Sequence, residues 1–211
     1  MGSVLIKVCG ITSTEDARMV AALGADWVGL NFHPASPRQI DEKTAKDIIA
    51  ALPLGCEAVG LFVDRPPGEV REVAQRLGLH LVQLHGSEPP TDIAALEGLD
   101  VIKAFRIGSL SDVESMGQYL AEAAPFAVLV DAFVAGRPGG TGQTLADELL
   151  MALPRLERLV LAGGLTPANV AERLTLARPW MVDVASGVES APGRKDPAKV
   201  AAFVQAARSP G

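Results

Sequence analysis

Short apolar runs alternate with amphipathic segments along the whole chain. The first run ends at Cys9, where Gly10 turns the chain away, and its β-branched residues are typical of a buried strand. By contrast, residues 41–52 carry Ala45, Ile48 and Ile49 on one face of a 3.6-residue period, which predicts a helix. The same patterns predict eight strands, at residues 4–9, 27–32, 58–63, 79–84, 101–105, 126–130, 159–162 and 181–185.

A helix is predicted after each strand. Thr12 or Ser13 can cap the first helix, and Gly78 can end the third. Thr166 followed by Pro167 is a typical start for the seventh helix. The predicted helices cover residues 12–23, 41–52, 66–77, 89–96, 110–123, 144–153, a segment from 166 onward, and 196–207.

This alternation indicates an α/β fold with a parallel sheet and helices packed outside it. Eight strand–helix units in 211 residues predict a single-domain (β/α)8 TIM barrel over residues 1–211. A doubly wound open sheet is the alternative, but its glycine-rich loop belongs after the first strand. Here the glycine-rich loops follow the sixth, seventh and eighth strands, which favours the barrel.

The composition of the chain argues against several classes of protein. The chain is 48% hydrophobic, which is enough for one substantial core, and its net charge of −6 with 4% aromatic residues argues against nucleic-acid binding. No apolar run is long enough to span a bilayer, and the N-terminus lacks the pattern of a signal peptide. Cys9 and Cys56 are the only cysteines, too few for a disulfide framework, so we expect free thiols and a cytoplasmic protein.

Glycines gather where the later strands end. In barrels, phosphate groups bind near the loops after strands seven and eight, where backbone N–H groups and a short helix start converge on the anion. A short extra turn is expected at residues 187–190. One such loop could serve only a tight turn, but three together predict a phosphate monoester ligand. The expected phosphate-binding residues are Gly140, Thr141, Gly142, Gly163, Gly164, Ser186 and Gly187.

Two strand ends carry residues suited to proton transfer. Cys9 is either a small core residue or a reactive thiol, and Asp131 is either a structural carboxylate or an acid whose pKa rises on desolvation. Strands one and six stand on different sides of an eight-stranded barrel, so the two groups can face each other across a small substrate. That arrangement is typical of isomerases. Something must lower the pKa of the thiol: the candidates are the dipoles of the phosphate site and a nearby cation such as Lys7, if it turns inward, or Arg38.

Three further polar residues lie near strand ends. Arg38 follows two prolines in the loop after the second strand, where it is either a solvated arginine or a bidentate partner for a substrate carboxylate. His85 follows the fourth strand and Asp183 lies in the eighth. The three histidines lack His-x-His spacing, which argues against a catalytic metal.

Eight segments spread along the chain carry these residues. They are KVCGIT (7–12), SPR (36–38), VGLFV (59–63), QLHG (83–86), VDA (130–132), GGTG (139–142), LAGGL (161–165) and DVASGVE (183–189). In this order, and over nearly the whole chain, they resemble phosphoribosylanthranilate isomerase. Two positions depart from that family's usual pattern: Ala185 replaces a second serine, and residues 144–146 lack the usual aromatic and acidic pair.

The resemblance implies a reaction and a role for each site residue. The reaction is a cofactor-free Amadori rearrangement in tryptophan biosynthesis, which converts N-(5-phosphoribosyl)anthranilate to 1-(2-carboxyphenylamino)-1-deoxyribulose 5-phosphate. Asp131 matches the general acid, Cys9 the general base and Arg38 the group that meets the anthranilate carboxylate, while His85 and Asp183 match polar residues lining the site. The family includes monomers and dimers, so the resemblance leaves a homodimer open.

Other phosphate-binding barrels remain as alternatives. An indole-3-glycerol-phosphate synthase needs a catalytic lysine at a strand end, whereas Lys103 lies inside the fifth predicted strand. A metal-dependent pentose-phosphate epimerase needs strand-end histidines paired with aspartates, and only His85 qualifies. A catalytically silent binding barrel is a third alternative, which the retained Cys9 and Asp131 argue against.

Overall fold

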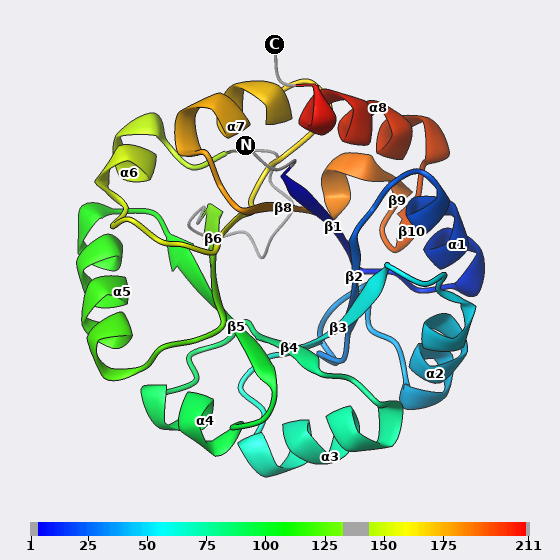
Figure 1. Ribbon diagram of the computed structural model, residues 1–211, viewed down its shortest axis with the longest axis horizontal. Coiled ribbons are helices and arrows are strands. Elements are labelled where there is room, and N and C mark those ends of the chain that lie inside the picture. Colours follow the sequence, from blue (N-terminus) through cyan, green and yellow to red (C-terminus); the bar gives the residue numbers. More distant parts are fainter. Residues whose placement is uncertain (1–3, 133–143, 210–211) are drawn as a thin grey trace.

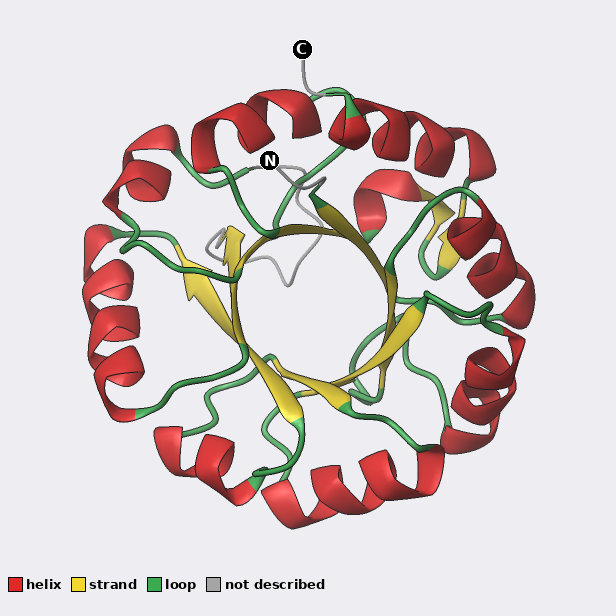
Figure 2. Cartoon of the chain, in the orientation of Figure 1, coloured by secondary structure: helices red, strands yellow, loops and turns green. Residues whose placement is uncertain are grey.

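The computed structural model describes residues 4–132 and 144–209. The predicted phosphate-binding residues Gly140, Thr141 and Gly142 lie outside the described residues. Eight parallel strands close into a barrel in chain order, with β8 beside β1, and the helices form a ring around them (Figures 1 and 2). The predicted (β/α)8 barrel is therefore confirmed.

The strands agree closely with the predicted runs. The main difference is β5, which extends to Ile107 because Arg106 and Ile107 pair with Asp131 and Ala132 of β6. Asp131 therefore lies within its strand. The strands are β1 (Leu5–Cys9), β2 (Trp27–Asn31), β3 (Glu57–Phe62), β4 (Leu81–Leu84), β5 (Asp100–Ile107), β6 (Ala127–Ala132), β7 (Leu159–Leu161) and β8 (Met181–Val184).

The helices begin and end at the expected kinds of residue. The Ser13 side chain caps α1 by accepting a hydrogen bond from the backbone of Asp16, and Gly78 ends α3 in the left-handed conformation. The helices are α1 (Thr14–Ala22), α2 (Glu42–Ala51), α3 (Pro67–Leu77), α4 (Pro90–Ala95), α5 (Leu110–Glu122), α6 (Asp147–Ala152), α7 (Val170–Ala177) and α8 (Pro197–Arg208).

Two helices start later than predicted. Before α6, Leu145 is buried and its carbonyl accepts a hydrogen bond from Arg173, so the lead-in packs against α7 instead of winding into helix. Before α7, the Thr166 carbonyl accepts from the N–H groups of Asn169 and Val170, while the Asn169 side chain accepts from the Thr166 N–H. Thr166 thus begins a turn, and the prediction that it caps the helix was wrong.

A short hairpin after β8 was not predicted. The 3-10 turn η1 (Ser186–Val188), close to the expected extra turn, leads into β9 (Glu189–Ala191), which pairs antiparallel with β10 (Arg194–Lys195). Strands of two and three residues are too short to show a period. Figure 1 shows the hairpin outside the barrel, near α1 and α8. It brings Lys195 against the carboxyl end of β1, where the lysine side chain donates to the Cys9 carbonyl.

Side chains alternate between two apolar layers. One cluster fills the barrel interior, and a larger one lies between strands and helices. Toward the carboxyl ends of the strands the interior becomes polar, with Lys7, Gln83 and Asp183 all buried. These residues form a polar layer below the loops. No helix among the described residues is long and apolar enough to cross a membrane. The interior cluster comprises Trp27, Val59, Leu81, Ile102, Ala104, Ala127, Leu129, Val160, Ala162 and Met181.

Candidate active site

A cavity of about 410 Å³ opens at the carboxyl ends of the strands. Every predicted site residue within the described part of the chain lines it. The polar side chains come from the strands β1, β6 and β8, from the loops after β2 and β4, and from the turn η1, and the glycines come from the loops after β7 and β8. These lining residues are Cys9, Arg38, His85, Asp131, Gly163, Gly164, Asp183, Ser186 and Gly187.

Two glycines make room for the two proton-transfer candidates. A Cβ atom at Gly29 of β2 would lie 2.6 Å from the sulfur of Cys9. A Cβ at Gly163 would lie 2.6 Å from Asp131 Oδ1, and Gly163 also has a φ of +83°, which other residues rarely adopt. The Cys9 thiol and the Asp131 carboxyl therefore each lie directly against the backbone of a glycine. A larger residue at Gly29 or Gly163 would displace the thiol or the carboxyl.

A buried ion pair lies beside Cys9. Lys7 and Asp183 are register partners across the β1–β8 seam, and Lys7 Nζ donates to Asp183 Oδ2 at 2.9 Å. Lys7 thus turns inward, as one of the sequence hypotheses required. Burial raises the pKa of the Cys9 thiol, and Asp183 adds to this, while Lys7 and Lys195 oppose it. Burial therefore disfavours the thiolate, and the two lysines reduce its cost.

Arg38 is held by a carboxylate from the unpredicted hairpin. Its Nε and Nη2 atoms donate to the two Glu189 oxygens at 2.8 and 2.6 Å, and this hydrogen bonding raises the pKa of Arg38. The arginine side chain lies over Gly10, where a Cβ atom would come within 2.3 Å of it. Glu189 takes the Nε edge of the guanidinium. The Nη1 edge is directed elsewhere and suits a substrate carboxylate.

Gln83 and His85 form a chain that ends at Asp131. Gln83 Nε2 lies 2.8 Å from His85 Nδ1, and His85 Nε2 lies 3.5 Å from Asp131 Oδ2. When the amide donates to Nδ1, the ring proton sits on Nε2 and faces the carboxylate. The second oxygen of Asp183 and the amide oxygen of Gln83 are buried and have no hydrogen-bond partner among the described residues. Buried acceptors of this kind suit the hydroxyl groups of a sugar.

The loops after β7 and β8 form an anion cradle. A Cβ atom at Gly187 would lie 1.9 Å from the Leu165 carbonyl oxygen, so only glycine lets the two loops come this close. Within residues 4–132 and 144–209, no acceptor takes the backbone N–H of Gly164 or Gly187. These donors and the adjacent 3-10 turn are suited to a phosphate group. No cluster of three or more His, Cys, Asp or Glu side chains in these residues could hold a metal ion.

Comparison with known proteins agrees with this geometry. The family model described as N-(5'phosphoribosyl)anthranilate (PRA) isomerase matches residues 6–206. The chain belongs to the phosphoribosylanthranilate isomerase family. An N-(5'-phosphoribosyl)anthranilate isomerase of Geobacter sulfurreducens is 46% identical over 97% of this chain and 98% of its own length.

Solved structures of the family superimpose on the whole barrel. Phosphoribosylanthranilate isomerase from Thermotoga maritima matches with a TM-score of 0.86 and 36% identity, covering 97% of this chain and 98% of its own. A second structure, with a TM-score of 0.83, 36% identity and the same coverage, is a complex with reduced 1-(o-carboxyphenylamino)-1-deoxyribulose 5-phosphate. The family assignment therefore rests on both sequence and fold.

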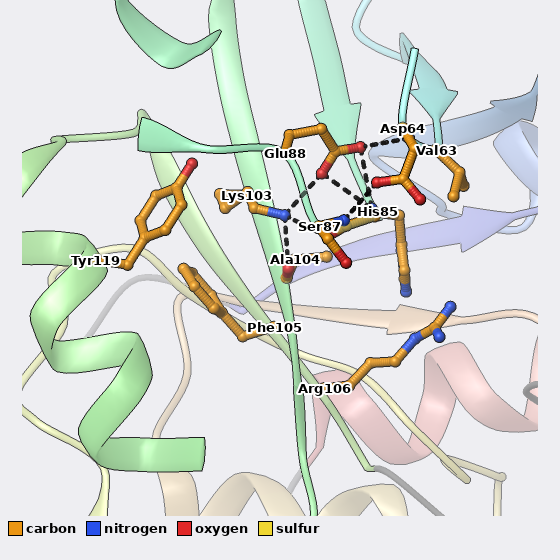
Figure 3. Close-up of a pocket in the computed structure, with 11 residues that line it drawn as sticks. Val63, Asp64, His85, Ser87, Glu88, Lys103, Ala104, Phe105, Arg106 and Tyr119 are labelled. Carbon is orange, nitrogen blue, oxygen red and sulfur yellow. Dashed lines mark hydrogen bonds and ion pairs between the residues drawn. The ribbon is translucent and has the colours of Figure 1, made fainter. Parts of the chain in front are cut away.

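In this member of the isomerase family a second cavity, of about 320 Å³, adjoins the first (Figure 3). His85 and Arg106 line both cavities. Lys103 lines only the second, where its Nζ donates to Glu88 at 2.8 Å and to the Gly86 carbonyl. Lys103 is thus a structural cation directed away from the active-site cavity, and this disfavours the synthase alternative.

Several residues of this isomerase site were missed by sequence reasoning. Arg106 was missed because its strand was predicted to end at residue 105. Gln83 lies inside a quoted segment, yet an amide in a strand gives no chemical signal alone. Glu189 and Lys195 depend on a hairpin that no periodicity indicated. Glu189 closes the quoted segment 183–189 and Lys195 follows Gly193 by two residues, but neither position carries a chemical signal of its own.

Proposed function

We propose that the chain catalyses the Amadori rearrangement of N-(5-phosphoribosyl)anthranilate to 1-(2-carboxyphenylamino)-1-deoxyribulose 5-phosphate. The observation that carries this proposal is the presence of Cys9 and Asp131 on one cavity, from strands β1 and β6, beside a glycine cradle. A thiol and a carboxylic acid on opposite walls suit a reaction that adds a proton to one substrate atom and removes one from another.

The substrate's two anionic ends fit the two ends of the cavity. The phosphate binds the backbone N–H groups of Gly163, Gly164, Ser186 and Gly187, which all line the cavity. The anthranilate carboxylate binds the guanidinium of Arg38. These contacts place the ribose between Cys9 and Asp131.

Two proton transfers then complete the rearrangement. Asp131 protonates the ribose ring oxygen, so the C1–O bond breaks and the nitrogen lone pair forms a Schiff base. Cys9, as the thiolate, removes the C2 proton, and the electrons of that bond give an enol-amine. The enol-amine becomes the ketose when its hydroxyl proton is lost and C1 is protonated. His85 orients Asp131 through Nε2, and the open Asp183 oxygen accepts a hydrogen bond from a substrate hydroxyl.

A fluorescence assay tests the reaction directly. Freshly prepared phosphoribosylanthranilate should lose its anthranilate fluorescence when the protein is added. We expect Cys9→Ser and Asp131→Asn each to lower turnover by about 100- to 10,000-fold, the usual contribution of a positioned acid or base. Both variants should still bind the reduced product analogue. Folded wild-type protein that leaves the fluorescence unchanged would contradict the proposed reaction, and near-wild-type turnover of a variant would contradict the role of that residue.

The proposed chemistry needs neither a cofactor nor a metal. Activity should therefore survive dialysis against a strong chelator. Cys9 and Cys56 are both free, which supports a reducing compartment such as the cytoplasm. Light scattering of the purified protein distinguishes a monomer from the homodimer that the resemblance leaves open.

A further inference from the structure

Lys195 is a buried cation that the proposed mechanism does not use. Its side chain is fully enclosed, and its Nζ donates to the backbone carbonyl of Cys9 at 2.6 Å. The same ammonium donates to the Ala185 carbonyl at 3.2 Å and to Glu189 Oε1 at 2.8 Å. Three acceptors satisfy the three N–H bonds of the ammonium. The lysine is thus fixed in position by the groups that it joins.

Each acceptor belongs to a different part of the site. Cys9 ends β1 and carries the thiol, whereas Ala185 precedes the turn η1, whose residues Ser186 and Gly187 line the anion cradle. Glu189 holds the guanidinium of Arg38. One ammonium therefore sets the relative positions of the thiol, the cradle and the arginine. Lys195 itself lies behind the cavity wall and does not line the cavity.

The charges around Cys9 do not balance. Lys7 on β1 is paired with Asp183 on β8, and Arg38 in the loop after β2 is paired with Glu189 on β9. Lys195 on β10 shares the Glu189 carboxylate, so three cations are ion-paired with two carboxylates on this side of the cavity. A third carboxylate, that of Asp16 on α1, accepts only the backbone N–H of Lys195, at 2.9 Å. Across the cavity lie the carboxyl of Asp131 and the ring of His85. A thiolate at Cys9 would neutralise the excess positive charge near it.

We propose that Lys195 is a positioning residue for Cys9, which fixes the strand end that carries the thiol and supplies the positive charge that favours the thiolate. The proposal rests on the proposed function, in which Cys9 is the base. Lys195 is among the groups that oppose the upward shift of the Cys9 pKa caused by burial, in agreement with the charge count. A purely structural clamp would hold the carbonyls equally well with a neutral donor.

Alkylation of Cys9 as a function of pH separates these two roles. In a Cys56→Ser background, the rate of reaction with iodoacetamide reports the thiolate of Cys9 alone, without substrate. Lys195→Gln keeps an N–H donor near the carbonyls but removes the charge. We expect its alkylation midpoint to rise by about one pH unit, within the range for loss of a nearby opposite charge. Lys195→Arg keeps the charge and should keep the midpoint close to that of the parent.

Lys199 provides the matched control. Its Nζ donates at 2.7 Å to the backbone carbonyl of Glu189, in the same hairpin, but it makes no contact with Cys9. Lys199→Gln should leave the midpoint unchanged. A midpoint in Lys195→Gln equal to that of the parent would overturn the proposal, and so would an equal rise in both variants.

Glu189→Gln gives an independent test with the opposite sign. It removes a negative charge and leaves Lys195 bonded to the carbonyls of Cys9 and Ala185, so the midpoint should fall. A rise would overturn the proposal, and this variant decides the question if Lys195→Gln does not fold. Turnover of the Cys56→Ser parent is measured separately. An inactive parent contradicts the proposed function, whereas unchanged midpoints contradict only the role of Lys195.

Discussion

Arg38 and Glu189 share two parallel hydrogen bonds, from Nε to Oε1 at 2.8 Å and from Nη2 to Oε2 at 2.6 Å. Glu189 is nearly buried, and Arg38 reaches the cavity from this pair. A bidentate pair of this kind fixes the plane of the guanidinium. The orientation of the arginine toward the substrate is thus set by a residue 151 positions further along the chain.

The first prediction concerns substrate affinity. Glu189→Gln keeps the size of the side chain but weakens the bidentate pair, so Arg38 becomes less ordered. We expect KM to rise about tenfold, which corresponds to about 1.4 kcal/mol, with a smaller change in kcat. Steady-state fluorescence assays measure both constants. The exposed bidentate pair of Arg76 with Glu42 is the control, and Glu42→Gln should change neither constant. A fall in kcat with unchanged KM would contradict this role.

The second prediction concerns acid stability. Burial raises the pKa of Glu189, but Arg38 and Lys195 outweigh it and hold the pKa below the ordinary value. Glu189 therefore stabilises the fold above its unfolded-state pKa of about 4.3, and this contribution is lost as the pH falls through the lower folded-state value. Glu189→Gln lacks a titrating group here. Below about pH 4.3 its melting temperature should therefore decline less steeply than that of the wild type. A series of thermal melts measures this, and parallel declines in the two proteins would show that Glu189 does not contribute to acid stability.

The third prediction concerns the close approach of two loops. A methyl group at Gly187 would collide with the Leu165 carbonyl oxygen, so Gly187→Ala must separate the loops after β7 and β8. We expect a loss of about 1–3 kcal/mol in the free energy of unfolding, and weaker binding of inorganic phosphate. Urea unfolding and phosphate titration measure these effects.

Gly117 in α5 is the control for that substitution. A Cβ atom there meets nothing within 4 Å. Gly117→Ala should stabilise the protein by about 0.5–1 kcal/mol, because alanine favours helix and the site is open. Equal destabilisation by both alanines would show that the loop contact is not the cause.

The fourth prediction concerns the ion pair of Lys103 with Glu88 (Figure 3). Glu88 also accepts hydrogen bonds from the N–H groups of Asp64 and Gly86, next to His85. Glu88→Gln leaves a buried ammonium without its counter-ion, so we expect a loss of about 3–5 kcal/mol in the free energy of unfolding. We also expect kcat/KM to fall, because the amide oxygen holds the N–H groups of the loop that carries His85 less firmly than the carboxylate does.

A double variant separates stability from activity at this pair. Glu88→Leu with Lys103→Met removes both charges and should recover much of the lost stability. The N–H groups of Asp64 and Gly86 then lack their acceptor, so kcat/KM should stay low. If activity returned together with stability, the pair would have no role in positioning His85.

The barrel could be predicted because each strand–helix unit carries its own signal. Apolar runs of β-branched residues, Ser13 as a helix cap and Gly78 as a helix end are local features, and the structure confirms them. The late start of α7 was not predictable in the same way. Thr166 and Pro167 form a typical cap sequence, but the N–H groups of Asn169 and Val170 donate to the Thr166 carbonyl, and the chain forms a turn before the helix.

The candidate site likewise contains residues that could be predicted from the sequence and partners that could not. Cys9, Asp131 and the glycine pairs stand at strand ends, so the barrel topology alone predicts that they meet. The partners of these residues could not be predicted, because they depend on long-range contacts. Glu189 and Lys195 reach Arg38 and Cys9 only through a hairpin of one three-residue and one two-residue strand. Lys7 meets Asp183 only because β1 closes against β8.

The meeting of β1 with β8 has a consequence for biosynthesis of the protein. The proposed base, on β1, leaves the ribosome before Asp183, Glu189 and Lys195, which lie on and after β8. Until residue 195 has emerged, Cys9 lacks the positive charge of Lys195 and the hydrogen bond from its ammonium to the Cys9 carbonyl. A nascent chain therefore cannot begin turnover early, and a truncation that removes the β9–β10 hairpin should silence the enzyme even if most of the barrel assembles.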